Sequence, residues 1–179
     1  MGSPKALLRY RDETFLDRLI GLFASRLDPV IVVLGANAEE IRSQTIRSAT
    51  FVVNGDYTQG QTSSLQCGLR ALPPAVRGVL FTLVDHPAVE PATLDALLQS
   101  PAAAAGLLRV PRYQGRRGHP IWFSRDLAAE FLALPATAAA RDVVRAHAAE
   151  TTILDLDDPG IAADIDHPAA YRTLLETGR

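Results

Sequence analysis

The sequence has few of the features that anchor secreted or membrane proteins. Its 179 residues include a single cysteine, Cys67, which excludes an internal disulfide and a multi-thiolate zinc site. No apolar run is long enough to cross a bilayer, and the first residues, Met1 to Lys5, show no signal-peptide pattern. We therefore expect a cytoplasmic protein with no membrane partner, in which Cys67 is a small buried thiol.

Strong charge of either sign is also absent. The formal net charge is −2 and charged residues make up 21% of the chain, so a general nucleic-acid or anionic-membrane partner is not expected. The apolar content of 47% is ordinary for a globular protein. A chain of this length is most simply one domain covering residues 1–179.

Lysine is the scarcest of the charged residues. Of 18 basic residues, Lys5 is the only lysine and the other 17 are arginine. A lysine carries a compact ammonium group on a flexible stem, which suits the binding of a phosphate by a point charge. Lys5 is therefore a candidate phosphate ligand, although survival of one lysine by chance is the alternative.

Apolar runs alternate with amphipathic segments along the chain. The expected strands cover residues 30–34, 51–53, 79–84, 106–111, 120–123 and 151–156, and the expected helices cover 14–26, 65–72, 90–98, 124–134, 138–148 and the segment from 168. Strands that alternate with helices predict a three-layer, Rossmann-like α/β fold with a mainly parallel sheet.

The run Val79 to Val84 is the most apolar of these strands and is followed directly by Asp85. Ligands of open α/β sheets bind beyond the carboxyl ends of the strands, and a carboxylate placed there can hold a divalent cation. The alternative is that Asp85 only caps the turn or the next helix.

Other polar side chains are expected at the same edge of the sheet. They are Lys5, Asn54, Gln61, Ser63, Ser64, Gly118-His119, Asp164 and Asp166. A cation, amide and hydroxyl donors near a helix start, and several carboxylates together favour a site for phosphate and metal. His119 is expected to position a ligand rather than transfer a proton, and His86 is expected to be a loop residue.

Five motifs, in order, resemble the MobA-like nucleotidyltransferase family, and most closely its molybdenum cofactor cytidylyltransferase branch. The motifs are Gly2-Ser3-Pro4-Lys5-Ala6-Leu7-Leu8, Gly60-Gln61-Thr62-Ser63-Ser64-Leu65, Val84-Asp85-His86-Pro87, Gly115-Arg116-Arg117-Gly118-His119-Pro120 and Asp164-Ile165-Asp166-His167-Pro168. The resemblance implies transfer of CMP, or GMP, from a nucleoside triphosphate to a phosphate-bearing acceptor such as molybdopterin, with release of pyrophosphate. It also implies Mg²⁺, with CTP as the favoured substrate.

The resemblance assigns roles to individual residues. It puts Lys5 on the triphosphate and Asp85 on Mg²⁺, with Asp164 or Asp166 as a second contact to metal or substrate. It places the polar cofactor-binding candidates Asn54, Gln61, Ser63 and Ser64 near the nucleotide, and Gly118 and His119 toward the acceptor. A molybdoenzyme or its chaperone is an implied partner.

The chain departs from the family pattern at its start. The family's phosphate loop normally follows a first strand and reads Leu-Ala-Ala-Gly-x-Ser-x-Arg-Met-Gly-x-Pro-Lys, whereas this sequence begins at the Met. We expect that the natural protein starts further upstream or that this chain is truncated and binds nucleotide poorly. Loss of that central strand should expose Val32 and residues 79–84. An alternative acceptor, or a non-catalytic accessory role, stays open.

Overall fold

The computed structural model describes residues 3–99, 106–135 and 138–177, so Gly2 of the first motif lies outside the described residues. In chain order the elements are η1 (Lys5–Leu7), β1 (Arg9–Tyr10), β2 (Glu13–Thr14), α1 (Phe15–Ala24), β3 (Ile31–Leu34), α2 (Ala38–Gln44), β4 (Thr50–Val53), η2 (Tyr57–Gln59), α3 (Gln61–Arg70), β5 (Gly78–Phe81), α4 (Pro91–Gln99), β6 (Leu108–Tyr113), β7 (Arg116–Arg117), β8 (Ile121–Ser124), η4 (Arg125–Leu127), α5 (Ala128–Ala133), α6 (Ala140–Ala146), η5 (Ala148–Glu150), β9 (Thr151–Asp155), η6 (Pro159–Ile161) and α7 (Pro168–Thr177). Among the described helices, none has the length and apolar character needed to span a bilayer.

The strands form a mixed sheet of five strands and a separate parallel pair. The larger sheet has the order β5-β8-β6-β7, and β9 pairs with the other edge of β6. Strand β8 runs antiparallel to both β5 and β6, whereas β9 runs parallel to β6. The parallel pair is β3 with β4, and a third, two-stranded antiparallel sheet joins β1 to β2. The predicted α/β class is confirmed, but the sheet is mixed rather than mainly parallel because β8 enters between β5 and β6 in the reverse direction.

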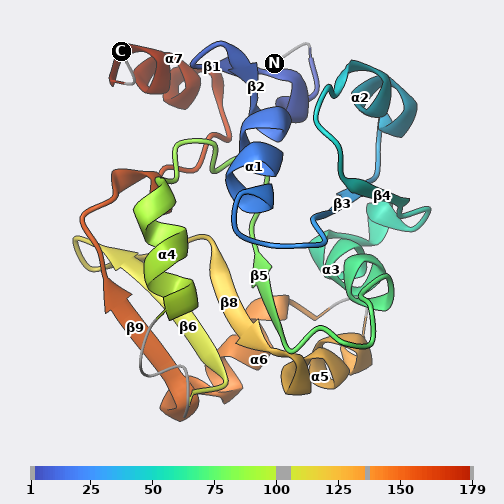
Figure 1. The fold of residues 1–179 in the computed structure, drawn as a ribbon, viewed down its shortest axis with the longest axis vertical. Helices are drawn as coiled ribbons and strands as arrows, with labels where there is room; N and C mark the ends of the chain where they lie inside the picture. Colours follow the sequence, from blue (N-terminus) through green and yellow to red (C-terminus); the bar gives the residue numbers. More distant parts are fainter. Residues whose placement is uncertain (1–2, 100–105, 136–137, 178–179) are drawn as a thin grey trace.

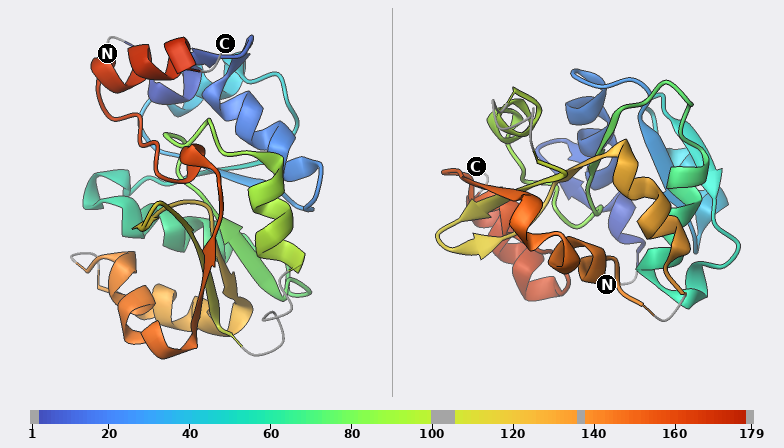
Figure 2. Two further views of the ribbon diagram at one scale, coloured as in Figure 1. Left: turned by 90° about the vertical axis from the view of Figure 1, so that its left-hand side faces the viewer. Right: turned by 90° about the horizontal axis from the view of Figure 1, so that it is seen from below.

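Helices cover both faces of the strands, as Figures 1 and 2 show. On one face α3, α5 and α6 pack with β6 and β8 around the buried Phe123 and Phe131. On the other face α1 and α4 meet around Leu19, Phe23 and Leu94. Burial of these apolar side chains is the main driving force for assembling the three layers.

Helix α1 shows how local sequence sets an element of this fold. Thr14 precedes the helix in an extended conformation, and its hydroxyl oxygen accepts a hydrogen bond from the Asp17 amide at 3.0 Å. This is an N-cap, as the sequence predicts. The buried Asp17 carboxylate in turn accepts hydrogen bonds from the amides of Ile46 and Arg47, so α1 also holds the chain that leads to β4.

Strand β5 is shorter than the sequence predicts. It covers Gly78–Phe81, and its last residue pairs with Ile121 of β8. The residue before Ile121 is Pro120, which has no amide hydrogen to extend the ladder. The apolar residues that follow, up to Val84, therefore continue as non-strand chain toward Asp85.

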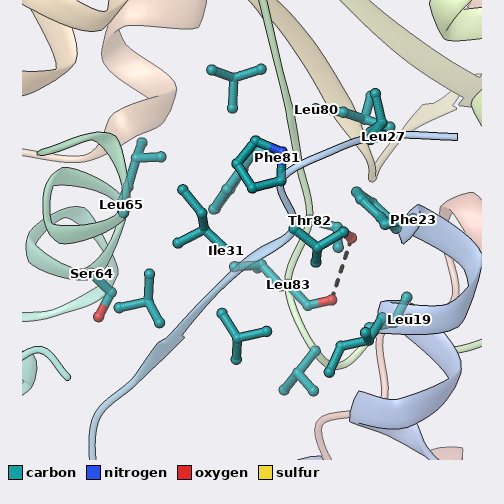
Figure 3. A pocket seen from close by; sticks show the side chains of 18 of the residues that line it. Leu19, Phe23, Leu27, Ile31, Ser64, Leu65, Leu80, Phe81, Thr82 and Leu83 are labelled. Carbon is teal, nitrogen blue, oxygen red and sulfur yellow. Dashed lines mark hydrogen bonds between the residues drawn. The ribbon is translucent and has the colours of Figure 1, made fainter. Parts of the chain in front are cut away.

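A cavity of about 480 Å³ separates β3 from β5 (Figure 3). Residues 30–35 line one wall and residues 78–84 line the opposite wall. The strand residues on both walls are mostly half-buried, where a complete sheet would bury them fully. Val32 and residues 79–84 are therefore half-buried rather than exposed.

We predict that His147 makes the stability of the C-terminal half depend on pH. Its Nε2 lies 2.9 Å from a Glu130 carboxylate oxygen of α5, and its Nδ1 lies 3.1 Å from Glu150 of η5. The hydrogen bond to Glu130, and then that to Glu150, raise the pKa of His147 above its usual value despite some burial. The stabilisation is fully present below the unfolded-state pKa of about 6.5 and is lost as pH rises through the folded-state pKa.

Urea unfolding of wild type and His147→Gln at pH 6 and pH 9 measures this effect. The free energy of unfolding should differ more between the two proteins at pH 6 than at pH 9. An equal difference at both pH values would show that the histidine acts through packing alone.

Candidate active site

Three segments that are far apart in the sequence meet beyond the end of β5. Lys5 is the first residue of η1, Asp85 follows β5, and Asp164 and Asp166 lie between η6 and α7. The N-terminal segment and the segment leading into α7 lie on the same side of the molecule in Figure 1. The fold therefore brings together the only lysine and three of the predicted acidic residues.

The charged groups of this cluster are in direct contact. The Lys5 ammonium forms an ion pair and hydrogen bond with Asp166, and its Nζ lies 3.7 Å from Oδ2 of Asp85. Carboxylate oxygens of Asp85, Asp164 and Asp166 lie within 4.8 Å of one another. Three carboxylates around one ammonium leave an excess of negative charge, which favours binding of a divalent cation.

A backbone contact fixes the two C-terminal aspartates against Asp85. The amide of Ile165 donates a hydrogen bond to the Asp85 carbonyl oxygen at 3.1 Å. The Ile165 side chain is 3% exposed and packs in a cluster with Tyr10 and Phe15. The buried isoleucine thus anchors the Asp-Ile-Asp motif, so that the aspartates on either side of it stay at the site.

Burial and mutual repulsion set the ionisation of the acidic cluster. Partial burial, followed by the charges of Asp85 and Asp166, raises the pKa of Asp164 above its usual value. The hydrogen bond from Lys5 lowers the pKa of Asp166. Partial burial lowers the pKa of the Lys5 ammonium. The hydrogen bond to Asp166 and the charge of Asp85 outweigh this effect, so that the pKa is raised above its usual value. At neutral pH the lysine is therefore fully charged.

Asp85 is the least exposed carboxylate of the acidic cluster. Its side chain is 13% exposed, and its Oδ1 is buried without a hydrogen-bond partner among the described residues. Nε2 of His86 lies 3.7 Å from that oxygen, beyond hydrogen-bond range. A buried carboxylate oxygen with no partner is costly, and a metal ion coordinated by it would remove that cost.

The loop that contains Gly118 and His119 packs closely against Ile161, in the segment before Asp164. A Cβ added to Gly118 would lie 1.8 Å from the carbonyl oxygen of Ile161, so only glycine fits. The next amide, that of His119, donates a hydrogen bond to the same carbonyl oxygen at 3.1 Å. The glycine therefore lets the loop after β7 dock on the segment that leads to Asp164.

The imidazole of His119 is neutral at physiological pH. Burial, and then repulsion from His86, lowers the pKa of His119 to about 4, although a hydrogen bond with the Phe81 backbone opposes this shift. The rings of His119 and His86 lie 4.9 Å apart between centroids. His119 can orient a ligand but cannot supply a positive charge. His86 lies in a loop, as predicted, but it is 6% exposed and its Nε2 lies 3.7 Å from Oδ1 of Asp85.

A second group of predicted site residues lies at the start of α3. The Asn54 amide donates hydrogen bonds to the hydroxyl oxygens of Ser63 and Ser64, at 2.9 and 3.0 Å. The Ser63 hydroxyl hydrogen-bonds the Gly60 and Asp56 carbonyl oxygens. Asn54 and Ser63 therefore join the end of β4 to the start of α3. Gln61 and Ser64 instead line the cavity between β3 and β5.

The cavity connects the two groups of site residues. Ala6, next to Lys5, and Val84, next to Asp85, line it together with Gln61 and Ser64. Chain neighbours of the charged cluster and the polar side chains of Gln61 and Ser64 thus border one hollow. The mutual hydrogen bonds of Asn54 and Ser63 carry no signal in the sequence, because they depend on how β4 and α3 dock.

Comparison with known proteins identifies the family of this chain. Residues 1–151 match the MobA-like NTP transferase domain. The chain belongs to the MobA-like NTP transferase family. A search of curated proteins finds no significant match.

Several solved structures share this MobA-like fold. The crystal structure of Rv0371c from Mycobacterium tuberculosis H37Rv superposes with a TM-score of 0.85 and 30% identity, over 98% of this chain and 90% of that chain. A complex of Rv0371c with manganese gives a TM-score of 0.77 and 30% identity, over 97% and 92%. The molybdopterin-guanine dinucleotide biosynthesis protein A of Archaeoglobus fulgidus gives a TM-score of 0.65 and 12% identity, over 98% and 91%, which shows the fold alone.

We predict that Asp164→Asn stabilises the metal-free protein at neutral pH. Because folding raises the pKa of Asp164, the protonated carboxyl stabilises the folded protein. This contribution is complete at pH values below the unfolded-state pKa and is lost as pH rises through the folded-state pKa. The ionised form at pH 7 therefore destabilises the fold, and an uncharged amide removes the repulsion.

Chemical unfolding in the presence of a chelator, at pH 7 and near pH 4, tests this. Asp164→Asn should raise the free energy of unfolding at pH 7, and its advantage should shrink as pH falls. Asp157→Asn is the matched control, because Asp157 lies outside the acidic cluster. Destabilisation by Asp164→Asn at pH 7 would contradict the predicted repulsion.

Proposed function

We propose that this MobA-like nucleotidyltransferase, a single domain acting in the cytoplasm, transfers CMP from CTP, or GMP from GTP, to a phosphate-bearing acceptor. Molybdopterin is the proposed acceptor, and pyrophosphate is the second product. The single observation that carries the proposal is the unpartnered Oδ1 of Asp85 beside Asp164, Asp166 and the Lys5 ammonium. A metal ion and a polyphosphate would complete this arrangement of charges.

The residues fit a divalent metal ion, here Mg²⁺ by proposal. Asp85 and one or both of Asp164 and Asp166 would hold it, since hard cations take carboxylate oxygens and keep several waters. When bound, the ion would supply charge neutralisation for the triphosphate. Rv0371c, which is 30% identical to this chain, has been solved in complex with manganese, and this supports the proposal of a divalent ion here.

The protein's own groups have clear tasks in such a reaction. Attack of an acceptor phosphate on the α-phosphorus brings two anions together, so catalysis needs charge neutralisation and alignment. Lys5 would bind the phosphates that leave as pyrophosphate, and in doing so would exchange Asp166 for a phosphate oxygen. Gln61 and Ser64 would contact the nucleoside, and the neutral His119 would orient the acceptor. No covalent protein nucleophile is required.

A second candidate function is that of an accessory protein in molybdoenzyme maturation, which would bind a cofactor or client without turnover. The cavity between β3 and β5 favours it, because strands that flank the site lack a neighbour there among the described residues. Another phosphate-bearing acceptor is a further alternative. A solved cytidylyltransferase for 2-C-methyl-D-erythritol 4-phosphate from Thermus thermophilus shares the fold, at TM-score 0.70 and 21% identity, over 99% of this chain and 95% of that chain.

Pyrophosphate release measured with each nucleoside triphosphate, Mg²⁺ and molybdopterin tests the proposed reaction. We expect turnover that requires the acceptor and is faster with CTP than with GTP. If pyrophosphate is released only with a different phosphate-bearing compound, that compound is the acceptor instead of molybdopterin. Nucleotide or pterin binding without release of pyrophosphate would favour the accessory role.

We predict that Asp85→Asn abolishes metal-dependent turnover while the fold is kept. Loss of the central carboxylate should lower activity about 100-fold or more and weaken Mn²⁺ binding, followed by electron paramagnetic resonance, at least about tenfold. Asp157→Asn should leave both quantities unchanged. Undiminished Mn²⁺ binding by Asp85→Asn would rule out Asp85 as a metal ligand.

A further inference from the structure

His86 is a buried histidine whose imidazole makes no hydrogen bond within the described part of the chain. Its side chain is 7% exposed, and its Nδ1 is buried without a hydrogen-bond partner. Buried polar atoms of folded proteins nearly always have such a partner, and an unpaired one costs free energy. The burial of this ring is therefore not explained by a structural hydrogen bond.

The other ring nitrogen of His86, Nε2, faces the central carboxylate of the acidic cluster. It lies 3.7 Å from Oδ1 of Asp85, the oxygen that is itself buried without a partner among the described residues. The second oxygen, Oδ2, lies 3.7 Å from Nζ of Lys5. The two oxygens of Asp85 thus face different groups, and the unpartnered one faces the imidazole.

The separation of these two atoms suits two ligands of one metal ion. At 3.7 Å, Nε2 and Oδ1 are too far apart for a hydrogen bond. Imidazole nitrogens and carboxylate oxygens each lie about 2.0–2.2 Å from an ion such as Zn²⁺, so two such ligands of one ion are roughly 3 to 4 Å apart. An ion between Nε2 and Oδ1 would give both atoms a partner.

The backbone around His86 is held in place on both sides. The His86 amide donates a hydrogen bond to the Leu83 carbonyl oxygen at 3.4 Å. The next carbonyl oxygen, that of Pro87, accepts a hydrogen bond from Nε of Arg18 at 2.7 Å, and Pro87 is fully buried. The imidazole is therefore presented to Asp85 by a fixed segment, as a metal ligand requires.

The other three histidines of the chain are placed differently. Of the described histidines, only His86 has a ring nitrogen within ion-pair distance of an oxygen of the acidic cluster. His167 accepts a hydrogen bond from the Ala170 amide through Nδ1, and His147 contacts Glu130 and Glu150. His119 has a buried, unpartnered Nδ1, and its ring lies 4.9 Å from that of His86 between centroids. It is the rival ligand that an experiment must separate from His86.

We propose that His86 supplies a nitrogen ligand, through Nε2, to the divalent cation held by Asp85, and that this ligand makes the site favour transition-metal ions such as Zn²⁺ over Mg²⁺. Mg²⁺ is bound through oxygen atoms, whereas imidazole is a preferred ligand of Zn²⁺ and its neighbours in the first transition series. The inference rests on the metal site of the proposed function and extends it to the identity of the ion.

Pulsed electron paramagnetic resonance of Mn²⁺ bound to the full chain, without nucleotide, tests the nitrogen ligand directly. The spin-echo envelope of wild type should show modulation from ¹⁴N, and labelling of the histidines with ¹⁵N should change it. His86→Phe should abolish the modulation, because it keeps a ring and removes both nitrogens. His167→Asn is the matched control, because it lies next to Asp166 and its side-chain oxygen can still accept the Ala170 amide bond.

Competition of Zn²⁺ and Mg²⁺ against the bound Mn²⁺ tests the preference. His86→Phe should weaken Zn²⁺ binding at least about tenfold, whereas Mg²⁺ binding should change little, since Mg²⁺ uses the carboxylates. His167→Asn should leave both affinities unchanged. Circular dichroism checks that the variants fold, and the ¹⁵N-labelled wild type needs no substitution.

Absence of nitrogen modulation in wild type, or its persistence in His86→Phe, would overturn the inference. Loss of the modulation in His119→Phe but not in His86→Phe would assign the ligand to His119 and overturn it as well. These failures are distinct from failure of the proposed function. Mn²⁺ bound through Asp85 without a nitrogen ligand leaves nucleotidyl transfer intact, whereas Mn²⁺ binding that survives Asp85→Asn would refute the metal site itself.

Discussion

The site depends on the concentration of negative charge around Asp85. Three carboxylates lie within 4.8 Å of one another, and the Lys5 ammonium neutralises only part of their charge. Such a cluster opposes folding, so other interactions must hold it in place. The amide of Ile165, bonded to the Asp85 carbonyl, and the buried side chain of Ile165 do so. Apolar burial thus stabilises a polar site that is itself unfavourable in the absence of a cation.

The acidic cluster contains the only lysine of the sequence, whose other basic residues are arginines. The different geometries of the two side chains explain why a lysine suits this position. An arginine held between Asp85 and Asp166 would form directional, bidentate bonds with one carboxylate. The point charge of Lys5 instead contacts both carboxylates. In the proposed reaction, a phosphate would compete with Asp166 for this ammonium. A cation that can change partner is better suited to binding and releasing polyphosphate.

Local sequence predicts much of this fold and part of the site. Thr14 caps α1 as expected, because an N-cap needs only residues within one turn. The position of Asp85 follows from the apolar run before it. The reversed direction of β8 could not be predicted, since pairing between β5, β6 and β8 depends on packing between distant segments. The burial of His86 and the mutual hydrogen bonds of Asn54 and Ser63 depend on the same long-range docking.

The open edges of β3 and β5 connect the architecture to the chemistry. Both strands lead toward the margin where Lys5 and Asp85 lie, and Ala6 and Val84 belong to the cavity wall. The charged cluster, and Gln61 and Ser64 of α3, approach this cavity from different elements. Their relative positions therefore depend on how the walls of the cavity pack against α1 and α3.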